Sequence, residues 1–268
     1  MPILEKDELL IDYLQEGQGP PVILIHSSVS GNRQWKTLTE SLRDERNVFS
    51  MNLMGYGKTS AWSNPIPLKL FEQVRLVLAL QEMVDQKVHL IGHSYGGSVA
   101  LKSAMSFSDK IESLVLLEPN PFYLLRQNHR MKTYQEVMQL SEKVRLHGLN
   151  HNWTRVAEIF ADYWIGDGAL NKMANHRKEA FIEGLKPNIH EWGILEEESK
   201  LEDIQKLPTR TLLIYDPKTV QSILEITDLL KDACPHWQFE SIPGAGHNAP
   251  ITHPDMINPM IRNFLNAS

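Results

Sequence analysis

The chain has 268 residues, of which 42% are hydrophobic and 22% charged, a composition that excludes collagen-like, coiled-coil and wholly disordered proteins. Its 27 lysines and arginines against 33 aspartates and glutamates give a formal net charge of -6, so nucleic acid is not an expected partner. No run of about 18 apolar residues exists and the first residues lack the apolar core of a signal peptide, so we expect a cytoplasmic protein without a membrane partner.

Short apolar runs rich in β-branched residues alternate along the chain with stretches of helical period. This alternation predicts an α/β fold with a mostly parallel central sheet flanked by helices. The runs expected as strands are residues 9–14, 22–26, 48–53, 88–92, 114–118, 212–216 and 237–242. Crossover helices are expected from the apolar spacing in residues 70–84, 98–107 and 220–230.

The pattern changes between residues 120 and 207, where helical segments rich in aromatic side chains follow one another without a strand pattern. Pro119, Pro121 and Pro208 flank this stretch and suit an exit from the sheet and a return to it. We therefore expect a core of residues 1–119 and 208–268 that carries a helical lid of residues 120–207. The lid aromatics fit either an apolar substrate pocket or ordinary helix packing: Trp153, Phe160, Tyr163, Trp164 and Phe181.

A single cysteine, Cys234, excludes an intramolecular disulfide, and its neighbours offer neither a base nor a cation to activate the thiol. The chain also lacks the H-E-x-x-H and paired C-x-x-C patterns of metal sites and a G-x-G-x-x-G pattern after a strand. We therefore expect a structural thiol, and neither a metal nor a cofactor.

A G-x-S-x-G pattern directly follows the strand expected at residues 88–92, with Ser94 at its centre between Gly92 and Gly96. A strand-to-helix turn of this kind is so tight that the serine adopts a strained backbone and only small residues fit two positions away. It brings the serine hydroxyl to the carboxyl end of the sheet, beside helix N–H groups that can stabilise an oxyanion. Ser94 is therefore the candidate nucleophile.

With this turn, the chain resembles the α/β-hydrolase superfamily from about residue 22 to its C-terminus, except across the lid. In that family a strand ends in a His-Gly pair, and the next residue supplies an oxyanion N–H. Here Ser27 replaces the glycine, so the resemblance implies that the N–H groups of Ser28 and Tyr95 form the oxyanion hole. A further segment, residues 52–60, resembles the D-x-x-G-x-G-x-S loop of the family, with Asn52 in place of the aspartate.

The histidine and the acid are implied by the same resemblance. The segment Gly244-Ala245-Gly246-His247 resembles the family's glycine-rich loop, which implies His247 as the general base.

The position of the usual catalytic aspartate holds Thr219, and a neutral hydroxyl cannot stabilise an imidazolium as a carboxylate does. Glu118 and Asp216 are expected at strand ends on the same side of the sheet. We favour Glu118, because some branches, including certain haloalkane dehalogenases, carry their acid there; Asp216 and a site without an acid stay open.

These residues predict a serine hydrolase that cleaves a small to medium ester or other acyl substrate through an acyl-enzyme. The serine at the elbow disfavours dehalogenase and epoxide-hydrolase chemistry, for which relatives use a carboxylate. The alternative is a catalytically weak ligand-binding or signalling protein on a degenerate hydrolase fold. The departures from the family pattern at Ser27, Asn52 and Thr219 keep that alternative open.

Overall fold

The computed structural model describes residues 2–64 and 66–267, and within them eight strands form one sheet in the order β1-β2-β4-β3-β5-β6-β7-β8. The strands from β4 to β8 in this order pair in parallel, whereas β1 and β2 join the edge antiparallel. Their bounds are β1 (Ile3–Lys6), β2 (Leu9–Glu16), β3 (Pro21–Ile25), β4 (Asn47–Met51), β5 (Val88–His93), β6 (Ile111–Leu117), β7 (Arg210–Tyr215) and β8 (Gln238–Ser241). The expected α/β fold and every expected strand are confirmed, with shifts of a few residues at the ends.

The first strand, β1, lies outside the predicted elements. It is four residues long and alternates half-buried and exposed side chains, so it carries little apolar pattern. It pairs with β2 through a two-residue turn in which Asp7 and Glu8 both have positive φ, 49° and 65°. Primed turns of this geometry match the twist of a hairpin, although the second of these positions usually holds a glycine and here holds Glu8.

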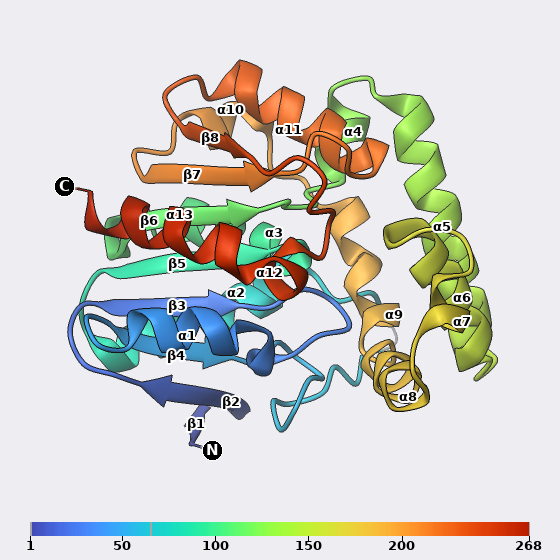
Figure 1. Cartoon of the computed structure of the whole chain (residues 1–268), viewed down its shortest axis with the longest axis horizontal. Coiled ribbons are helices and arrows are strands. Elements are labelled where there is room, and N and C mark those ends of the chain that lie inside the picture. The colour runs from blue at the N-terminus through green and yellow to red at the C-terminus, as the bar shows by residue number, and fades with distance from the viewer. Residues whose placement is uncertain (1, 65, 268) are drawn as a thin grey trace.

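Helices cover both faces of the sheet (Figure 1). On one face lie α2 (Leu70–Val84), α3 (Tyr95–Ser106) and α11 (Gln221–Ala233), which confirm the three predicted crossover helices. On the other face lie α1 (Lys36–Leu42) and α13 (Pro254–Asn266), which pack against each other and were not predicted. The short α1 has a mixed pattern, and Pro259 inside α13 interrupts the helical signal there.

The two faces of the sheet have separate apolar cores, because alternate residues of a strand point to opposite sides. Val22 and Leu24 of β3 belong to the core beneath α1 and α13. Ile23 and Ile25 belong to the core beneath α2, α3 and α11. All four side chains are fully buried, as expected for a parallel strand covered on both faces.

A helical segment joins β6 to β7, and most of it forms an insertion that lies beyond the carboxyl ends of the parallel strands (Figure 1). It consists of α4 (Tyr123–Gln127), α5 (Met131–Leu149), α6 (Trp153–Trp164), α7 (Ala169–Lys172), α8 (Asn175–Gly184) and α9 (Asn188–Glu191), followed by η3 (Trp192–Glu196) and α10 (Leu201–Gln205). Residues 120–207 are all described and contain no strand, as the sequence patterns predict. The division between core and lid at residues 119 and 208 stays a prediction.

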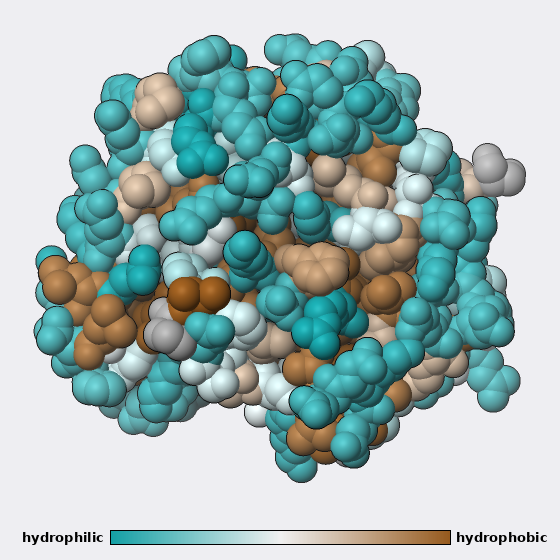
Figure 2. Space-filling model, turned by 180° about the vertical axis from the view of Figure 1, so that it is seen from behind, coloured by the Kyte–Doolittle hydropathy of each residue, from teal (hydrophilic) through white to brown (hydrophobic). Residues whose placement is uncertain are grey.

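The surface opposite the view of Figure 1 is covered mostly by polar side chains, with apolar ones in scattered groups (Figure 2). Among the described residues, no helix has the length and apolarity needed to cross a membrane. The single cysteine, Cys234, is fully buried at the end of α11, and burial raises the pKa of its thiol to about 11. A buried thiol with a raised pKa is a poor nucleophile, in line with the expected structural role.

Candidate active site

Ser94 occupies the sharp turn between β5 and α3, with φ 53° and ψ −118°. Its N–H donates a hydrogen bond to Leu117 O at 2.9 Å, which ties the turn to the neighbouring strand. A Cβ atom on Gly92 would lie 2.3 Å from Gly96 O, and one on Gly96 would lie 2.3 Å from His26 O. Only glycine fits at either position, so the G-x-S-x-G pattern follows from the packing of the strained turn.

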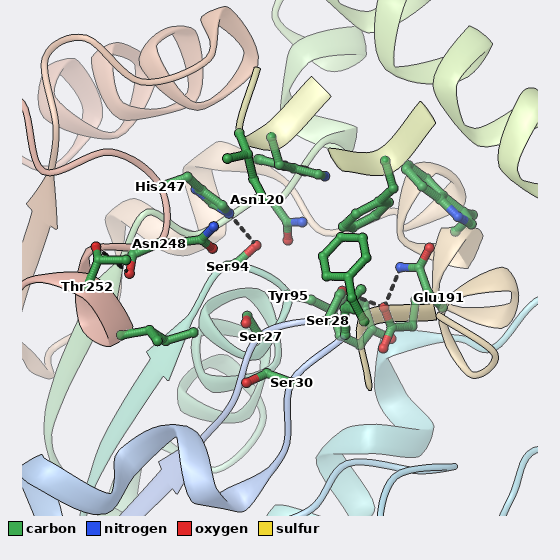
Figure 3. A pocket seen from close by; sticks show the side chains of 18 of the residues that line it. Ser27, Ser28, Ser30, Ser94, Tyr95, Asn120, Glu191, His247, Asn248 and Thr252 are labelled. Carbon is green, nitrogen blue, oxygen red and sulfur yellow. Dashed lines mark hydrogen bonds between the residues drawn. The ribbon is translucent and has the colours of Figure 1, made fainter. Parts of the chain in front are cut away.

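Ser94, His247 and Glu118 form one hydrogen-bonded chain of buried side chains. His247, in the loop before α12 (Ala249–Thr252), has its Nε2 atom 2.9 Å from Ser94 Oγ (Figure 3). Its Nδ1 atom is 2.6 Å from Glu118 Oε2. With the proton on Nδ1 donated to the carboxylate, Nε2 is free to accept the serine proton, which is the arrangement of a general base.

Glu118 follows β6 with a positive φ of 43° and is 3% exposed. Its carboxylate accepts two hydrogen bonds besides that of His247: Asp216 N donates to Oε1 at 2.8 Å and Thr219 Oγ1 donates to Oε2 at 2.8 Å. Thr219, at the position where the family resemblance led us to expect an aspartate, therefore donates to the carboxylate that contacts the histidine. These donors fix the orientation of Glu118 against the imidazole.

Asp216, the other carboxylate considered from the sequence, bonds the backbone of the histidine loop. It accepts hydrogen bonds from Lys218 N at 2.9 Å, Gly244 N at 3.1 Å and Gly246 N at 2.6 Å. Burial raises the pKa of Asp216, but the three N–H donors and the Lys218 charge together lower it by more. The pKa of Asp216 therefore lies below its ordinary value. Among the described residues, its carboxylate has no hydrogen bond to the ring of His247.

The two implied oxyanion donors lie beside the same cavity as Ser94. Tyr95 begins α3, and the N–H groups of a first helical turn have no partner within the helix. Ser28 belongs to residues 27–29, which we call the oxyanion loop. Within the described part of the chain, neither the Ser28 N–H nor the Tyr95 N–H donates a hydrogen bond to another protein group. Both are thus available to a ligand oxygen.

A cavity of about 370 Å³ opens beside Ser94, between the sheet and the helical insertion (Figure 3). Its wall combines aromatic side chains from the insertion with hydroxyl and amide groups near the serine: Phe122, Phe160, Trp164, Phe181 and Trp192, with Ser27, Ser28, Ser30, Asn120, Asn188, Asn248 and Thr252. Trp164 stacks on the His247 ring with centroids 4.2 Å apart. Of the lid aromatics noted in the sequence, Phe160, Trp164 and Phe181 line the cavity, whereas Tyr163 bonds Ser222 Oγ instead.

A second network, which the sequence patterns did not reveal, joins the oxyanion loop to the histidine loop. Gln34 Oε1 accepts from Ser27 N at 3.1 Å and from Ser27 Oγ at 2.9 Å. Gln34 Nε2 donates to His93 Nδ1 at 3.2 Å, and His93 Nε2 donates to His247 O at 2.8 Å. Burial holds the pKa of His93 well below its ordinary value, so the ring is neutral and can accept at one nitrogen while donating at the other.

A buried lid carboxylate, Glu191 of α9, also went unnoticed in the sequence. It accepts hydrogen bonds from Tyr56 OH at 2.8 Å and from Asn188 Nδ2 at 2.8 Å. It also accepts one from Ser28 Oγ at 2.5 Å, and Figure 3 labels both Ser28 and Glu191. Burial raises the pKa of Glu191, and the three donors lower it in part. No sequence pattern marks this residue, because its partners on the core lie far away along the chain.

Comparison with known proteins identifies the family. The chain matches the family model of the alpha/beta hydrolase fold over residues 20–254 and belongs to this family. It is 26% identical over 267 residues to a 2-hydroxy-6-oxo-6-(2'-aminophenyl)hexa-2,4-dienoic acid hydrolase of Metapseudomonas resinovorans. The matched region covers 91% of this chain and 83% of that relative.

Two solved structures share the fold. An alpha/beta hydrolase enzyme from a Medee basin deep-sea metagenome library matches with a TM-score of 0.85 at 17% identity, over 100% of this chain and 98% of its own. A thermophilic esterase from Thermogutta terrifontis matches with a TM-score of 0.72 at 23% identity, over 96% and 93% of the two chains. The expected family and fold are thus confirmed, and hydrolases stand among the relatives.

Proposed function

We propose that the protein is a serine hydrolase that cleaves a small to medium ester or other acyl substrate through an acyl-enzyme on Ser94. The observation that carries this proposal is the hydrogen-bonded chain from Ser94 through His247 to Glu118 at the wall of an apolar cavity. A serine, a base and an orienting carboxylate in this geometry can generate a nucleophile that is much stronger than a free hydroxyl.

In the proposed mechanism, Ser94 Oγ attacks the substrate carbonyl while His247 Nε2 accepts the serine proton. Glu118 stabilises the imidazolium that forms, and the N–H groups of Ser28 and Tyr95 stabilise the negative charge on the former carbonyl oxygen. His247 then donates its proton to the leaving group, which departs and leaves the acyl-enzyme. A water molecule, deprotonated by His247, hydrolyses this ester and restores Ser94.

The departures from the family pattern each have a hydrogen-bonding role, which argues against a degenerate site. Ser27 Oγ donates to Gln34 Oε1, and Thr219 Oγ1 donates to Glu118. Asn52 Nδ2 donates to Asp12 Oδ2 at 2.9 Å, beneath the loop at residues 53–59. These contacts support the serine hydrolase over the alternative of a catalytically weak binding protein.

The cavity supports an acyl substrate with an apolar portion. Its volume of about 370 Å³ suits a small to medium ligand, and aromatic side chains make up much of its wall. Among the relatives, one is named a dienoic acid hydrolase and one an esterase. We favour esters and related acyl compounds, because Ser28 and Tyr95 line the cavity and, among the described residues, their N–H groups have no protein acceptor and can bond a carbonyl oxygen that becomes negative.

The test is the intact mass of the protein after reaction with an alkyl fluorophosphonate, which needs an activated serine and an oxyanion hole but no knowledge of the substrate. We expect one adduct in the wild type, no adduct in Ser94→Ala, and an unchanged adduct in Ser30→Ala, a serine of the same cavity outside the proposed triad. A series of p-nitrophenyl esters of increasing acyl length then measures the preferred chain. A folded wild type that forms no adduct would overturn the proposal and favour the binding protein.

A further inference from the structure

Glu191 is a buried carboxylate that the proposed mechanism does not use. It lies on α9 in the helical insertion, is 2% exposed, and bonds two groups of the core, Ser28 Oγ and Tyr56 OH. Its third donor, Asn188 Nδ2, lies on the same short helix. The lid therefore hydrogen-bonds the oxyanion loop through the Glu191 side chain.

The charge of Glu191 has no ion-pair partner among the described residues, since all three hydrogen-bond donors are neutral groups. Burying a carboxylate without a cation costs free energy, even when hydrogen bonds compensate part of it. An amide or an apolar side chain would avoid this cost. The cost of burying this carboxylate therefore indicates that Glu191 does more than stabilise the fold.

The oxyanion loop is strained next to the proposed donor. Val29 has φ 64°, a left-handed conformation that is a genuine outlier for a β-branched residue. Two contacts hold it: Val29 N donates to Tyr56 OH at 3.0 Å, and Gly184 of α8 packs so closely that a Cβ there would lie 2.7 Å from Val29 O. Strained residues of this kind persist only where their surroundings fix them, and they cluster at functional sites.

Tyr56 connects the strained residue to the lid carboxylate. Its hydroxyl oxygen accepts from Val29 N while its proton is donated to Glu191 Oε1, and Glu191 Oε2 accepts from Ser28 Oγ. On the other side of the loop, Gln34 of the core accepts from the backbone and side chain of Ser27. The Ser28 N–H thus lies between an anchor on the core and an anchor on the lid.

We propose that Glu191 is a positioning residue that holds the oxyanion loop in its strained conformation and so aims the Ser28 N–H at the oxyanion. The inference rests on the proposed serine hydrolase function. According to this proposal, the oxyanion hole forms only when the lid packs against the core, because the conformation of the oxyanion loop depends on a side chain of α9. Removal of one oxyanion donor typically costs about 10²–10³ in turnover, so a donor that is displaced and still present should cost less.

The experiment compares Glu191→Gln, Ser28→Ala and Glu197→Gln with the wild type. Ser28→Ala removes the hydroxyl that Glu191 bonds but keeps the backbone N–H. Glu197→Gln is the matched control, because Glu197 is also a lid carboxylate, but it bonds Lys102 Nζ and Ser199 Oγ, away from the oxyanion loop. Each variant is assayed for the rate of fluorophosphonate labelling, for kcat and KM on one p-nitrophenyl ester, and for inhibition by an alkyl boronic acid.

The boronic acid forms a tetrahedral adduct with an active serine and puts a boron-bound oxygen near the oxyanion donors, so its affinity reports the geometry of the hole. For Glu191→Gln and Ser28→Ala we expect about a tenfold to hundredfold loss in kcat and in boronic acid affinity, with KM within about threefold. Glu197→Gln should match the wild type. The double variant Glu191→Gln/Ser28→Ala should lose less than the sum of the two single variants, because both act on the hydrogen bond between Ser28 Oγ and Glu191 Oε2.

The outcomes separate this inference from the proposed function. A wild type that does not react with the fluorophosphonate contradicts the function itself. A reactive wild type with Glu191→Gln no slower than Glu197→Gln overturns the inference alone, and so does a rise in KM with kcat unchanged, which would make Glu191 a substrate-binding group. If Glu191→Gln fails to fold, Ser28→Ala decides, because it breaks the same hydrogen bond without changing the lid.

Discussion

The proposed catalytic groups lie in two regions that are held in different ways. Ser94 and Glu118 directly follow the adjacent strands β5 and β6, and backbone hydrogen bonds to neighbouring strands fix both. Ser94 N donates to Leu117 O, and Glu118 N donates to Ile214 O at 3.0 Å. The oxyanion loop leaves the sheet after β3 and is held by side chains, Gln34 from the core and Glu191 from the lid. The proposed nucleophile and the proposed acid therefore take their geometry from the sheet, whereas the proposed oxyanion donor takes part of its geometry from the helical insertion.

Glu118→Gln should have the largest effect on the region that the sheet holds. An amide keeps the shape of the side chain but cannot stabilise an imidazolium, so we expect kcat on a p-nitrophenyl ester to fall by about 10³–10⁴ with the fold intact. Asp216→Asn should lose much less, because Asp216 bonds only backbone N–H groups of the neighbouring loops. A larger loss in Asp216→Asn than in Glu118→Gln would identify Asp216 as the acid instead.

Acid should destabilise the fold through neutral histidines buried in both regions. Burial lowers the pKa of His26, beside the oxyanion loop, and of His89, in the sheet, from 6.5 to about 4 each. Between these values the unfolded chain binds more protons than the folded chain. Each histidine should therefore reduce the free energy of unfolding by about 1.4 kcal/mol per pH unit as the pH falls from 6.5 towards 4.

Urea unfolding at several pH values measures this slope. His89→Asn should reduce the slope of the free energy of unfolding against pH by the contribution of one histidine, because asparagine does not titrate. The asparagine can still bond Ser113 Oγ, the partner of His89 at 2.7 Å. Since His89 is remote from the cavity, the fluorophosphonate reaction of His89→Asn should match that of the wild type. An unchanged slope would contradict the low pKa assigned to the buried ring.

Thr219→Val should give the smallest loss in kcat, and it tests whether the Thr219 hydroxyl helps to orient Glu118. The substitution removes the hydroxyl that donates to Glu118 Oε2 and keeps the side-chain shape, so we expect about a tenfold loss in kcat from a less well oriented carboxylate. The control is Thr227→Val on α11, a threonine that is also buried but whose hydroxyl has no hydrogen bond to the described site residues. Equal rates in the two variants would show that Thr219 only fills space.

The parts of the molecule that sequence reasoning reached are those whose signals are local. The central strands and the Ser94 turn could be predicted, because apolar runs and glycine spacing reflect packing within a few residues. The pairing of Glu118 with His247 joins residues 129 apart in sequence, so the sequence offered Glu118 only as the favoured of two carboxylates. The contact now supports that choice, which stays a proposal until the variants are measured.

The positions that sequence reasoning missed have partners that are distant or conformations that leave no mark. Glu191 bonds Ser28, 163 residues away, and is one of many glutamates in the chain. A valine carries no sign of a left-handed backbone, so the strain at Val29 could not be read from its residue type. Gln34 likewise looks like an ordinary polar residue after a loop, until its contacts to Ser27 and His93 are known.

The hydrogen bonds of Glu118 have an evolutionary consequence. Glu118 is where the chain leaves the sheet for the insertion, and Asp216 and Thr219, which donate to it, lie where the chain has returned through β7. The carboxylate thus joins the end of the strand before the insertion to the end of the strand after it, and both to His247. Sequence changes in the helices between β6 and β7 can therefore alter the wall of the cavity, while the supports of the proposed acid and its contact to His247 stay in place.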